Sequence, residues 1–165
     1  MRRARLAGCD RLTYSTCFAV TAPKVILLVD DDPNDVELTL RAFRANPLGN
    51  HVVVAHDGRE ALDYLHATGP LAGRAAEDLP QVVLLDLNLP VLDGLEVLRR
   101  IRADPRTRHL PVVILTSSDE HSDKLAGYGL GANSYVRKPV DFKQFSEAVN
   151  RLGLYWMLVN EPPPS

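Results

Sequence analysis

Residues 25–33 read VILLVDDDP, an apolar run that ends abruptly in three carboxylates and a proline. Such a run of valine, isoleucine and leucine is typical of a strand buried on both faces of a parallel sheet. Pro33 suits the first turn of a helix, and the residues that follow place Val36, Leu40 and Phe43 on one stripe. The stretch therefore predicts a strand, an acidic loop and an amphipathic helix.

The alternation of apolar runs and helical patterns continues along the chain. We expect strands at Val25–Val29, His51–Ala55, Val82–Leu85, Val112–Leu115 and Ser134–Val136. We expect further helices over residues 58–67 with Asp57 as cap, over 95–102 with Asp93 as cap, over 120–130, and after Asp141, which with Gln144 resembles a capping box. Strands that alternate with helices predict an α/β fold, a doubly wound five-stranded parallel sheet with five helices on both faces.

Length and composition agree with one domain and exclude several classes of protein. The 165 residues are 45% hydrophobic and 24% charged, with a net charge of −2. This balance is too apolar for a disordered polymer and too neutral for a protein that wraps nucleic acid. The longest apolar run, Leu154–Val159, has six residues, whereas a membrane-spanning helix needs about 20. We therefore expect no association with a membrane.

The ends of the chain differ from its body in charge and apolarity. Residues 1–24 carry a net charge of +4 and the remainder −6. We expect residues 1–23 to form a basic, disordered extension and residues 24–152 to form the domain. The tail, residues 153–165, begins with apolar and aromatic residues and predicts a dimer contact. Both cysteines, Cys9 and Cys17, lie in the basic extension, so the domain itself suits the reducing cytoplasm.

Polar side chains follow the predicted strands at the points where they end. Asp30 and Asp31 follow the first strand, Asp86 the third, Thr116 the fourth and Lys138 the fifth. The carboxyl ends of parallel strands meet at one edge of the sheet, where ligands bind. Carboxylates gathered there repel one another unless a cation joins them, and Mg²⁺ prefers oxygen ligands. A lysine and a threonine beside them suit a phosphoryl group, for which Asp86 is the best nucleophile candidate.

These motifs together resemble the receiver domain of two-component response regulators. They are VDDD (29–32), LLDLNLPVLDG (84–94), LTSS (115–118) and SYVRKP (134–139), in that order. The resemblance covers about residues 24–152 and implies a flavodoxin-like strand order, 2-1-3-4-5. It also implies a Mg²⁺-dependent phosphoacceptor with self-catalysed phosphotransfer and autodephosphorylation, not a turnover enzyme.

The resemblance assigns a role to each site residue. Asp86 would accept the phosphoryl group from a histidine kinase or a histidine phosphotransfer protein. Asp31, Asp86 and the backbone carbonyl of Asn88 would ligate Mg²⁺ directly, and Asp30 would act through water. Thr116 and Lys138 would contact the phosphoryl group, and Tyr135 would act as a conformational switch. The resemblance also implies a cis peptide bond before Pro139.

A narrower resemblance is to single-domain regulators that partner bacterial phytochrome photoreceptor kinases. It rests on the run PNDVELTL (33–40), the long loop over residues 68–80 and the aromatic tail. Such regulators dimerise, and we expect a homodimer through the last helix and tail; the alternative is that the tail folds back over its own domain. No DNA-binding module follows Leu152, so output by partner binding or phosphate relay is expected.

Other interpretations of these residues are open on sequence alone. Asp32 precedes Pro33 and suits a helix cap as well as a second layer around a metal. Tyr135 suits strand packing as well as a switch, and Ser118 and Asn88 suit ordinary loop polarity as well as tuning of phosphate lifetime. An aspartyl-phosphate phosphohydrolase is the enzyme alternative, but its second acid would stand where Asn88 does. A receiver-like scaffold that takes no phosphate is the third class.

Overall fold

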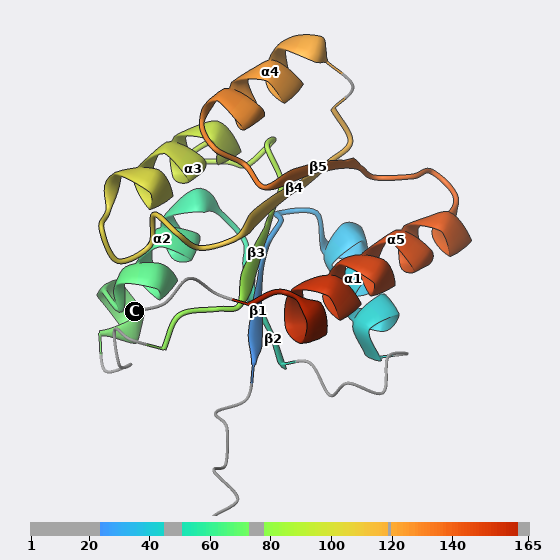
Figure 1. Cartoon of the computed structure of the whole chain (residues 1–165), viewed down its shortest axis with the longest axis horizontal. Coiled ribbons are helices and arrows are strands. Elements are labelled where there is room, and N and C mark those ends of the chain that lie inside the picture. The colour runs from blue at the N-terminus through green and yellow to red at the C-terminus, as the bar shows by residue number, and fades with distance from the viewer. Residues whose placement is uncertain (1–23, 45–50, 73–77, 119, 162–165) are drawn as a thin grey trace, which may run out of the picture.

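The computed structural model describes residues 24–44, 51–72, 78–118 and 120–161, and within them the predicted α/β fold is confirmed (Figure 1). The predicted extension, residues 1–23, lies outside this part. Five parallel strands run in the order β2-β1-β3-β4-β5. The strands are β1 (Val25–Val29), β2 (His51–Ala55), β3 (Val82–Leu85), β4 (Val112–Thr116) and β5 (Ser134–Arg137). The helices are α1 (Pro33–Arg44), α2 (Gly58–His66), α3 (Gly94–Ala103), α4 (His121–Gly129) and α5 (Phe142–Leu154), with a 3₁₀ turn at Gly69–Leu71 and a π-helix at Tyr155–Val159.

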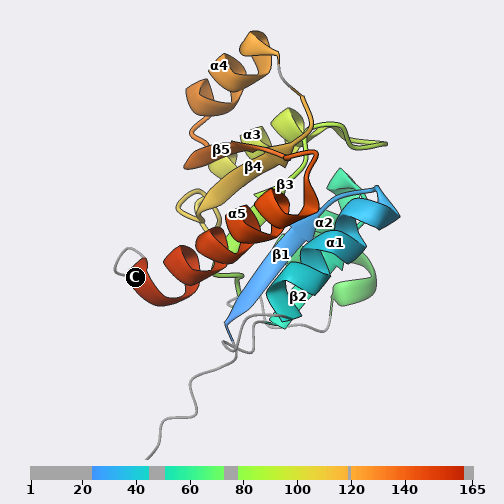
Figure 2. The same cartoon turned by 90° about the vertical axis from the view of Figure 1, so that its right-hand side faces the viewer.

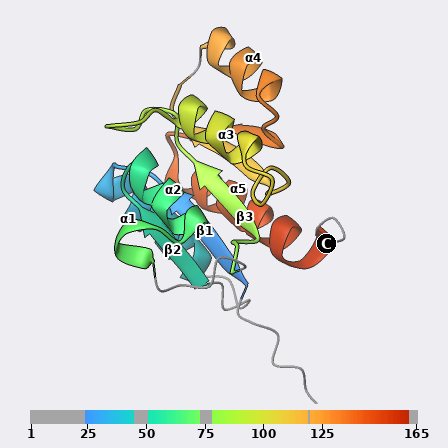
Figure 3. The same cartoon turned by 90° about the vertical axis from the view of Figure 1, so that its left-hand side faces the viewer.

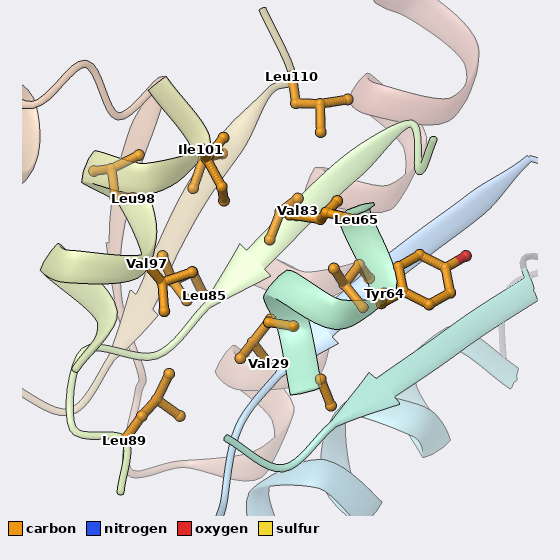
Figure 4. Close-up of a cluster of buried hydrophobic side chains, with 14 of the residues drawn as sticks. Val29, Tyr64, Leu65, Val83, Leu85, Leu89, Val97, Leu98, Ile101 and Leu110 are labelled. Carbon is orange, nitrogen blue, oxygen red and sulfur yellow. The ribbon is translucent and has the colours of Figure 1, made fainter. Parts of the chain in front are cut away.

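The sheet lies between two layers of helices, because successive side chains of a strand point to opposite faces. In β3, Val82 and Leu84 pack toward α1 and α5, and Val83 and Leu85 pack toward α2 and α3. Figures 2 and 3 show the two helical layers from opposite sides. Figure 4 shows the core on the α2 and α3 side, where Leu65 and Ile101 close over the strands. All four residues of β3 are buried, and β3 is the middle strand of the five.

The predicted helix starts agree with the structure, since each depends on a local contact. The side chain of Asp57 accepts hydrogen bonds from the backbone N–H groups of Arg59 and Glu60. Asp93 accepts one from Glu96 N and Asp141 one from Gln144 N, at 2.9 and 3.0 Å. These caps satisfy N–H groups that a helix leaves unpaired in its first turn. The observed helix and strand ends differ from the predicted ones by at most one residue where both were stated.

Helix α4 is the most loosely packed of the described helices. Gly127 is its one buried residue, and Leu125 and Tyr128 are exposed. A Cβ at Gly127 would lie 2.5 Å from Cδ1 of Ile114 in β4, so this glycine permits the close approach of helix and sheet. Figure 1 shows α4 standing away from the other helices.

The tail divides between its own domain and the surface. Helix α5 continues into the π-helix, where Trp156 and Met157 are buried in the same core as α1 and α5. The ammonium of Lys24 donates a hydrogen bond to the carbonyl of Met157 at 2.5 Å. Tyr155 and Leu158 are exposed. The tail therefore folds back in part, as the alternative interpretation holds, and keeps an apolar outer side.

In the described part of the chain, none of the helices combines the length and the apolar character that a membrane span needs.

The loop between β3 and α3 holds a strained residue at its tip. Val91 has φ of +67° and a relative exposure of 78%. A left-handed backbone is unfavourable for a β-branched residue, because Cβ approaches the following carbonyl oxygen. The loop is fixed on both sides, since Gly94 N donates to Leu87 O at 3.0 Å and Leu92 N to Pro90 O at 2.7 Å. Neighbouring contacts thus hold Val91 in this conformation.

Replacing Val91 by asparagine is expected to stabilise the protein by about 0.5 to 1 kcal/mol, because asparagine tolerates the left-handed region. The free energy of unfolding, from urea denaturation at an unchanged m value, measures this gain. Val140→Asn is the matched control, since Val140 is fully exposed and has no positive φ. An equal gain in both variants would contradict the strain at Val91.

Candidate functional site

The carboxyl ends of β1, β3 and β5 bring five charged side chains together. Asp30 follows β1, Asp86 follows β3 and Lys138 follows β5, and all three are buried. Their positions follow from the strand order, because β1 and β3 are neighbours and β4 and β5 continue the sheet beyond β3. Asp31 lies in the loop after β1, and Asp35 lies in the first turn of α1.

Asp86 is held by its own loop in a fixed orientation. Its backbone N–H donates to Val29 O at 2.9 Å, which continues the pairing of β1 and β3. Its Oδ1 accepts a hydrogen bond from Leu87 N at 2.7 Å, and its Oδ2 lies 3.3 Å from Lys138 Nζ. A Cβ at Gly94 would lie 2.2 Å from the carbonyl oxygen of Asp86. Glycine at this position therefore lets α3 begin directly against the loop that follows β3.

The ammonium of Lys138 joins three carboxylates from three elements. Nζ lies 2.7 Å from Oδ2 of Asp30, 2.7 Å from Oδ2 of Asp35 and 3.3 Å from Oδ2 of Asp86. The backbone N–H of Lys138 donates to Thr116 O at 2.8 Å, which fixes the start of its side chain beside β4. Lys138 thus ties β5 to β1, α1 and β3.

Burial and charge act in opposite directions on the pKa values of this pair. Burial raises the pKa of Asp30 above its usual range, and the hydrogen bond from Lys138 and its charge offset part of that rise. Burial alone would lower the pKa of Lys138, but its hydrogen bonds to Asp30 and Asp35 and the charge of Asp86 outweigh burial, so the pKa is raised. Lys138 therefore stays a charged ammonium near neutral pH.

The carboxylates also fit a hard divalent cation. Asp30, Asp31 and Asp86 can each offer one oxygen, and these oxygens lie within 4.8 Å of one another. Asp31 is exposed, and its carboxylate makes no hydrogen bond or ion pair with the described residues. Asp30, Asp35 and Asp86 contact the one ammonium of Lys138, and with Asp31 the cluster has four carboxylates, which leaves three formal negative charges uncompensated. An all-oxygen donor set of this charge is what Mg²⁺ prefers in proteins.

Thr116 and Tyr135 contact the same residue from opposite sides. The hydroxyl of Thr116, fully buried, accepts a hydrogen bond from Ser118 N at 3.2 Å. The hydroxyl of Tyr135 donates to Ser118 O at 3.3 Å, and the ammonium of Lys124 lies 5.7 Å from the centre of its ring. The loop after β4 is thus held by Thr116 through an N–H group and by Tyr135 through a carbonyl.

Three features predicted near the site can be compared with the structure. Asp32 is the cap of α1, because its Oδ1 accepts from Asn34 N at 2.8 Å and from Asp35 N at 3.4 Å. The side chain of Asn88 is exposed, and its backbone carbonyl accepts no hydrogen bond from the described residues, so it is free to serve as a ligand. The cis bond expected before Pro139 is wrong, since no described peptide bond is cis. The trans form is the lower-energy default even before proline.

Asp35 is the site residue that the sequence interpretation missed. It lies 103 residues from Lys138 along the chain. Its acidic character alone is uninformative, because acids are common in first helical turns, where they stabilise the positive end of the helix dipole. The available signal was its spacing, since a residue four positions after Asp31 in a helix that begins at Pro33 can return to the same edge of the sheet.

Comparison with known proteins identifies the family. Residues 26–150 match the model of the response regulator receiver domain, so the chain belongs to that family. FilR2, a probable methanogenesis regulatory protein of Methanothrix harundinacea, is 38% identical over 86% of this chain and 88% of its own length. The response regulator Rcp1 of Synechocystis is 34% identical over 82% of this chain and 90% of its own.

Solved structures agree with this assignment. The bacteriophytochrome response regulator RtBRR is 52% identical, with a TM-score of 0.69 over 87% of this chain and 86% of its own. The phosphorylated cyanobacterial phytochrome response regulator RcpA is 35% identical, with a TM-score of 0.80 over 87% and 100%. The Mn²⁺-bound form of Rcp1 is 33% identical, with a TM-score of 0.79 over 86% and 100%. Two of these solved structures, RtBRR and RcpA, are thus of phytochrome response regulators.

A divalent cation is expected to stabilise the wild-type protein, because it offsets repulsion that exists only when the carboxylates are brought together. Mg²⁺ at about a hundred times its Kd should add about 2.7 kcal/mol to the free energy of unfolding. Calorimetry with and without Mg²⁺ measures the increment, and Asp31→Asn should remove most of it. Asp32→Asn, which makes the same change one residue on and preserves the helix cap, should retain the increment. Loss of the increment in both variants would argue against Asp31 as a ligand.

Proposed function

We propose that this chain is a phosphoacceptor of two-component signalling, with Asp86 as the acceptor. The observation that carries the proposal is the environment of Asp86: one oxygen is fixed by Leu87 N and the other faces the Lys138 ammonium inside an acidic cluster. A carboxylate in this setting can act as a nucleophile, because the ammonium already lies where the negative charge of the phosphorylated product will be. The family and its two-component role support the same assignment.

The reaction transfers a phosphoryl group from a histidine to Asp86. An oxygen of Asp86 attacks phosphorus and a P–O bond forms, while the P–N bond of the phosphohistidine breaks and the imidazole nitrogen keeps the electron pair and takes up a proton. Lys138 neutralises a phosphoryl oxygen, and the hydroxyl of Thr116 turns from Ser118 to donate to another. Hydrolysis later removes the phosphoryl group. Water attacks phosphorus and the P–O bond to Asp86 breaks, which returns the Asp86 carboxylate and inorganic phosphate.

Receiver domains bind a divalent metal ion, and Mg²⁺ is the ion we propose here. Asp31, Asp86 and the carbonyl of Asn88 would hold it directly, and Asp30 would act through water. When bound, the ion supplies positive charge for the phosphoryl oxygens.

The contacts of Ser118 provide a route from the phosphoryl group to the surface. When the Thr116 hydroxyl leaves Ser118 N, the loop that also holds the Tyr135 hydroxyl loses its hydrogen bond to the end of β4 at that hydroxyl, while Ser118 keeps its side-chain contact with Asp123 at the start of α4. We propose that Tyr135 and the loop before α4 then rearrange together and change partner binding. The exposed residues of α4, whose packing is loose, are suited to respond.

The donor we propose is a sensor histidine kinase of the phytochrome type, or a histidine phosphotransfer protein, in the cytoplasm. The support is the 52% identity with RtBRR and the phytochrome association of RcpA. The absence of cysteine after Cys17 suits that reducing compartment.

Incubation with acetyl phosphate and Mg²⁺ is expected to add about 80 Da to the wild-type chain, the mass of one phosphoryl group. Intact-mass spectrometry measures the adduct, and Asp86→Asn should abolish it. Asp93→Asn is the matched control, because Asp93 is an exposed helix cap and asparagine preserves the cap.

An equal adduct in Asp86→Asn would remove the proposal. Sustained turnover of small phosphate monoesters by the wild type, abolished in Asp86→Asn, would instead favour the phosphohydrolase alternative. A wild-type chain that takes up no phosphoryl group would favour the scaffold alternative.

We further propose that two copies associate through the outer side of the tail. Leu154, Tyr155, Leu158 and Val159 are exposed and adjacent along the chain, while their neighbour Trp156 is buried beneath them. A second copy presents the same apolar patch, so the two can pair around a twofold axis. Aromatic and aliphatic residues in one exposed patch are typical of such interfaces.

Leu158→Glu is expected to convert a dimer to a monomer, because it places a charge in the centre of this patch. Sedimentation velocity measures the mass, and Val140→Glu is the control, an exposed valine outside the tail. Truncation at Leu152 would be a poor test, since it also removes Trp156 and Met157 from the core. Persistence of the dimer in Leu158→Glu, or a monomeric wild type, would contradict the tail interface.

A further inference from the structure

Every hydrogen on the ammonium of Lys138 has a carboxylate partner. A lysine ammonium has three N–H donors, and Asp30, Asp35 and Asp86 take them at 2.7, 2.7 and 3.3 Å. A phosphoryl oxygen on Asp86 can receive a hydrogen bond from Lys138 only if one of these carboxylates gives up its own. The site is therefore built for an exchange of partners.

The three carboxylates differ in the cost of losing the ammonium. The side chain of Asp30 is 1% exposed and that of Asp86 is 10% exposed, whereas that of Asp35 is 29% exposed. A released carboxylate must be hydrated, and burial makes a charge without a partner costly. Asp86 in addition carries the incoming group. Asp35 is thus the partner whose release costs least.

The local structure of α1 holds the backbone of Asp35 in place whether or not its carboxylate binds the Lys138 ammonium. Its backbone N–H is capped by Asp32, and its carbonyl accepts a hydrogen bond from the hydroxyl of Thr39 at 2.8 Å. Asp35 takes part in these contacts only through its backbone, so they persist when its side chain leaves Lys138. The first turn of α1 thus places the Asp35 carboxylate beside Lys138 but does not need their ion pair to form.

We propose that Asp35 is a positioning residue that holds the Lys138 ammonium while Asp86 is unmodified and gives it up when a phosphoryl group arrives. This inference rests on the proposed function, because it takes Asp86 as the acceptor. The phosphoryl group adds about −1.5 to −2 charges and requires the ammonium. Asp35 competes for the same donor, and it thereby lowers the stability of the phosphorylated state relative to the unmodified one.

Removal of the Asp35 charge is therefore expected to strengthen binding of a phosphoryl mimic. The probe is beryllofluoride at saturating Mg²⁺, with its Kd measured by ¹⁹F NMR on the full chain. Asp35→Asn should bind it about two- to fivefold more tightly than wild type, the upper part of the range for an exposed ion pair. Asp35→Glu, which restores the charge, should return the Kd toward the wild-type value. Asp35→Ser, which retains a polar group in the first turn, should show the same gain as Asp35→Asn.

Glu37→Gln is the matched control, since it removes one negative charge from the same helix at a residue that pairs with Arg41. Its Kd should stay at the wild-type value. Equal or weaker binding in both Asp35→Asn and Asp35→Ser, with the wild-type unfolding temperature retained, would overturn the inference, as would an equal gain in Glu37→Gln. A wild-type chain that binds no beryllofluoride and takes no phosphoryl group from acetyl phosphate would overturn the proposed function itself.

Discussion

The ammonium of Lys138 compensates negative charge that the fold places in the interior. Asp30 and Asp86 are buried at the ends of adjacent strands, and two carboxylates in such a position repel each other unless a cation lies between them. Lys138 meets this requirement with one group that reaches β1, β3 and α1 from the end of β5. Because the compensation is incomplete, the same cluster can also hold a divalent ion and then accept a further anionic group. The contacts that compensate the buried charges in the folded protein are therefore the same contacts that the proposed phosphoryl transfer uses.

The two helical layers explain why this cluster can be both buried and responsive. The strands beneath it are apolar on both faces and leave no freedom for β1, β3 or β4. The loop after β4 is held above them by hydrogen bonds of Ser118 to Thr116, Tyr135 and Asp123 rather than by buried apolar packing. A rigid sheet fixes the positions of the charges, and loosely attached loops and α4 carry the response. This division matches the general tendency of moving elements to have few buried apolar contacts.

Most of the fold and most of the site followed from the sequence. The strands were recognisable as apolar runs, and Asp57, Asp93 and Asp141 marked helix starts through contacts that span two or three residues. The parallel arrangement alone predicts that Asp30, Asp86 and Lys138 lie at one edge of the sheet. The interpretation missed Asp35, because its contact with Lys138 joins residues far apart along the chain. It was also wrong about the cis bond before Pro139, and it left Asp32 undecided between a cap and a metal neighbour, although both features are local.

The sequence by itself determined the alternation of strands and helices, their caps and the acidic strand ends, because each depends on neighbours within a few residues. Tertiary structure alone decided that Asp35 meets Lys138, that Trp156 enters the core while Leu158 stays outside, and that Val91 is held in a left-handed conformation. Those outcomes depend on how α1, α5 and the loop after β3 pack against the sheet. Packing sums many weak contacts between distant segments, so no local pattern encodes the final position of any one side chain.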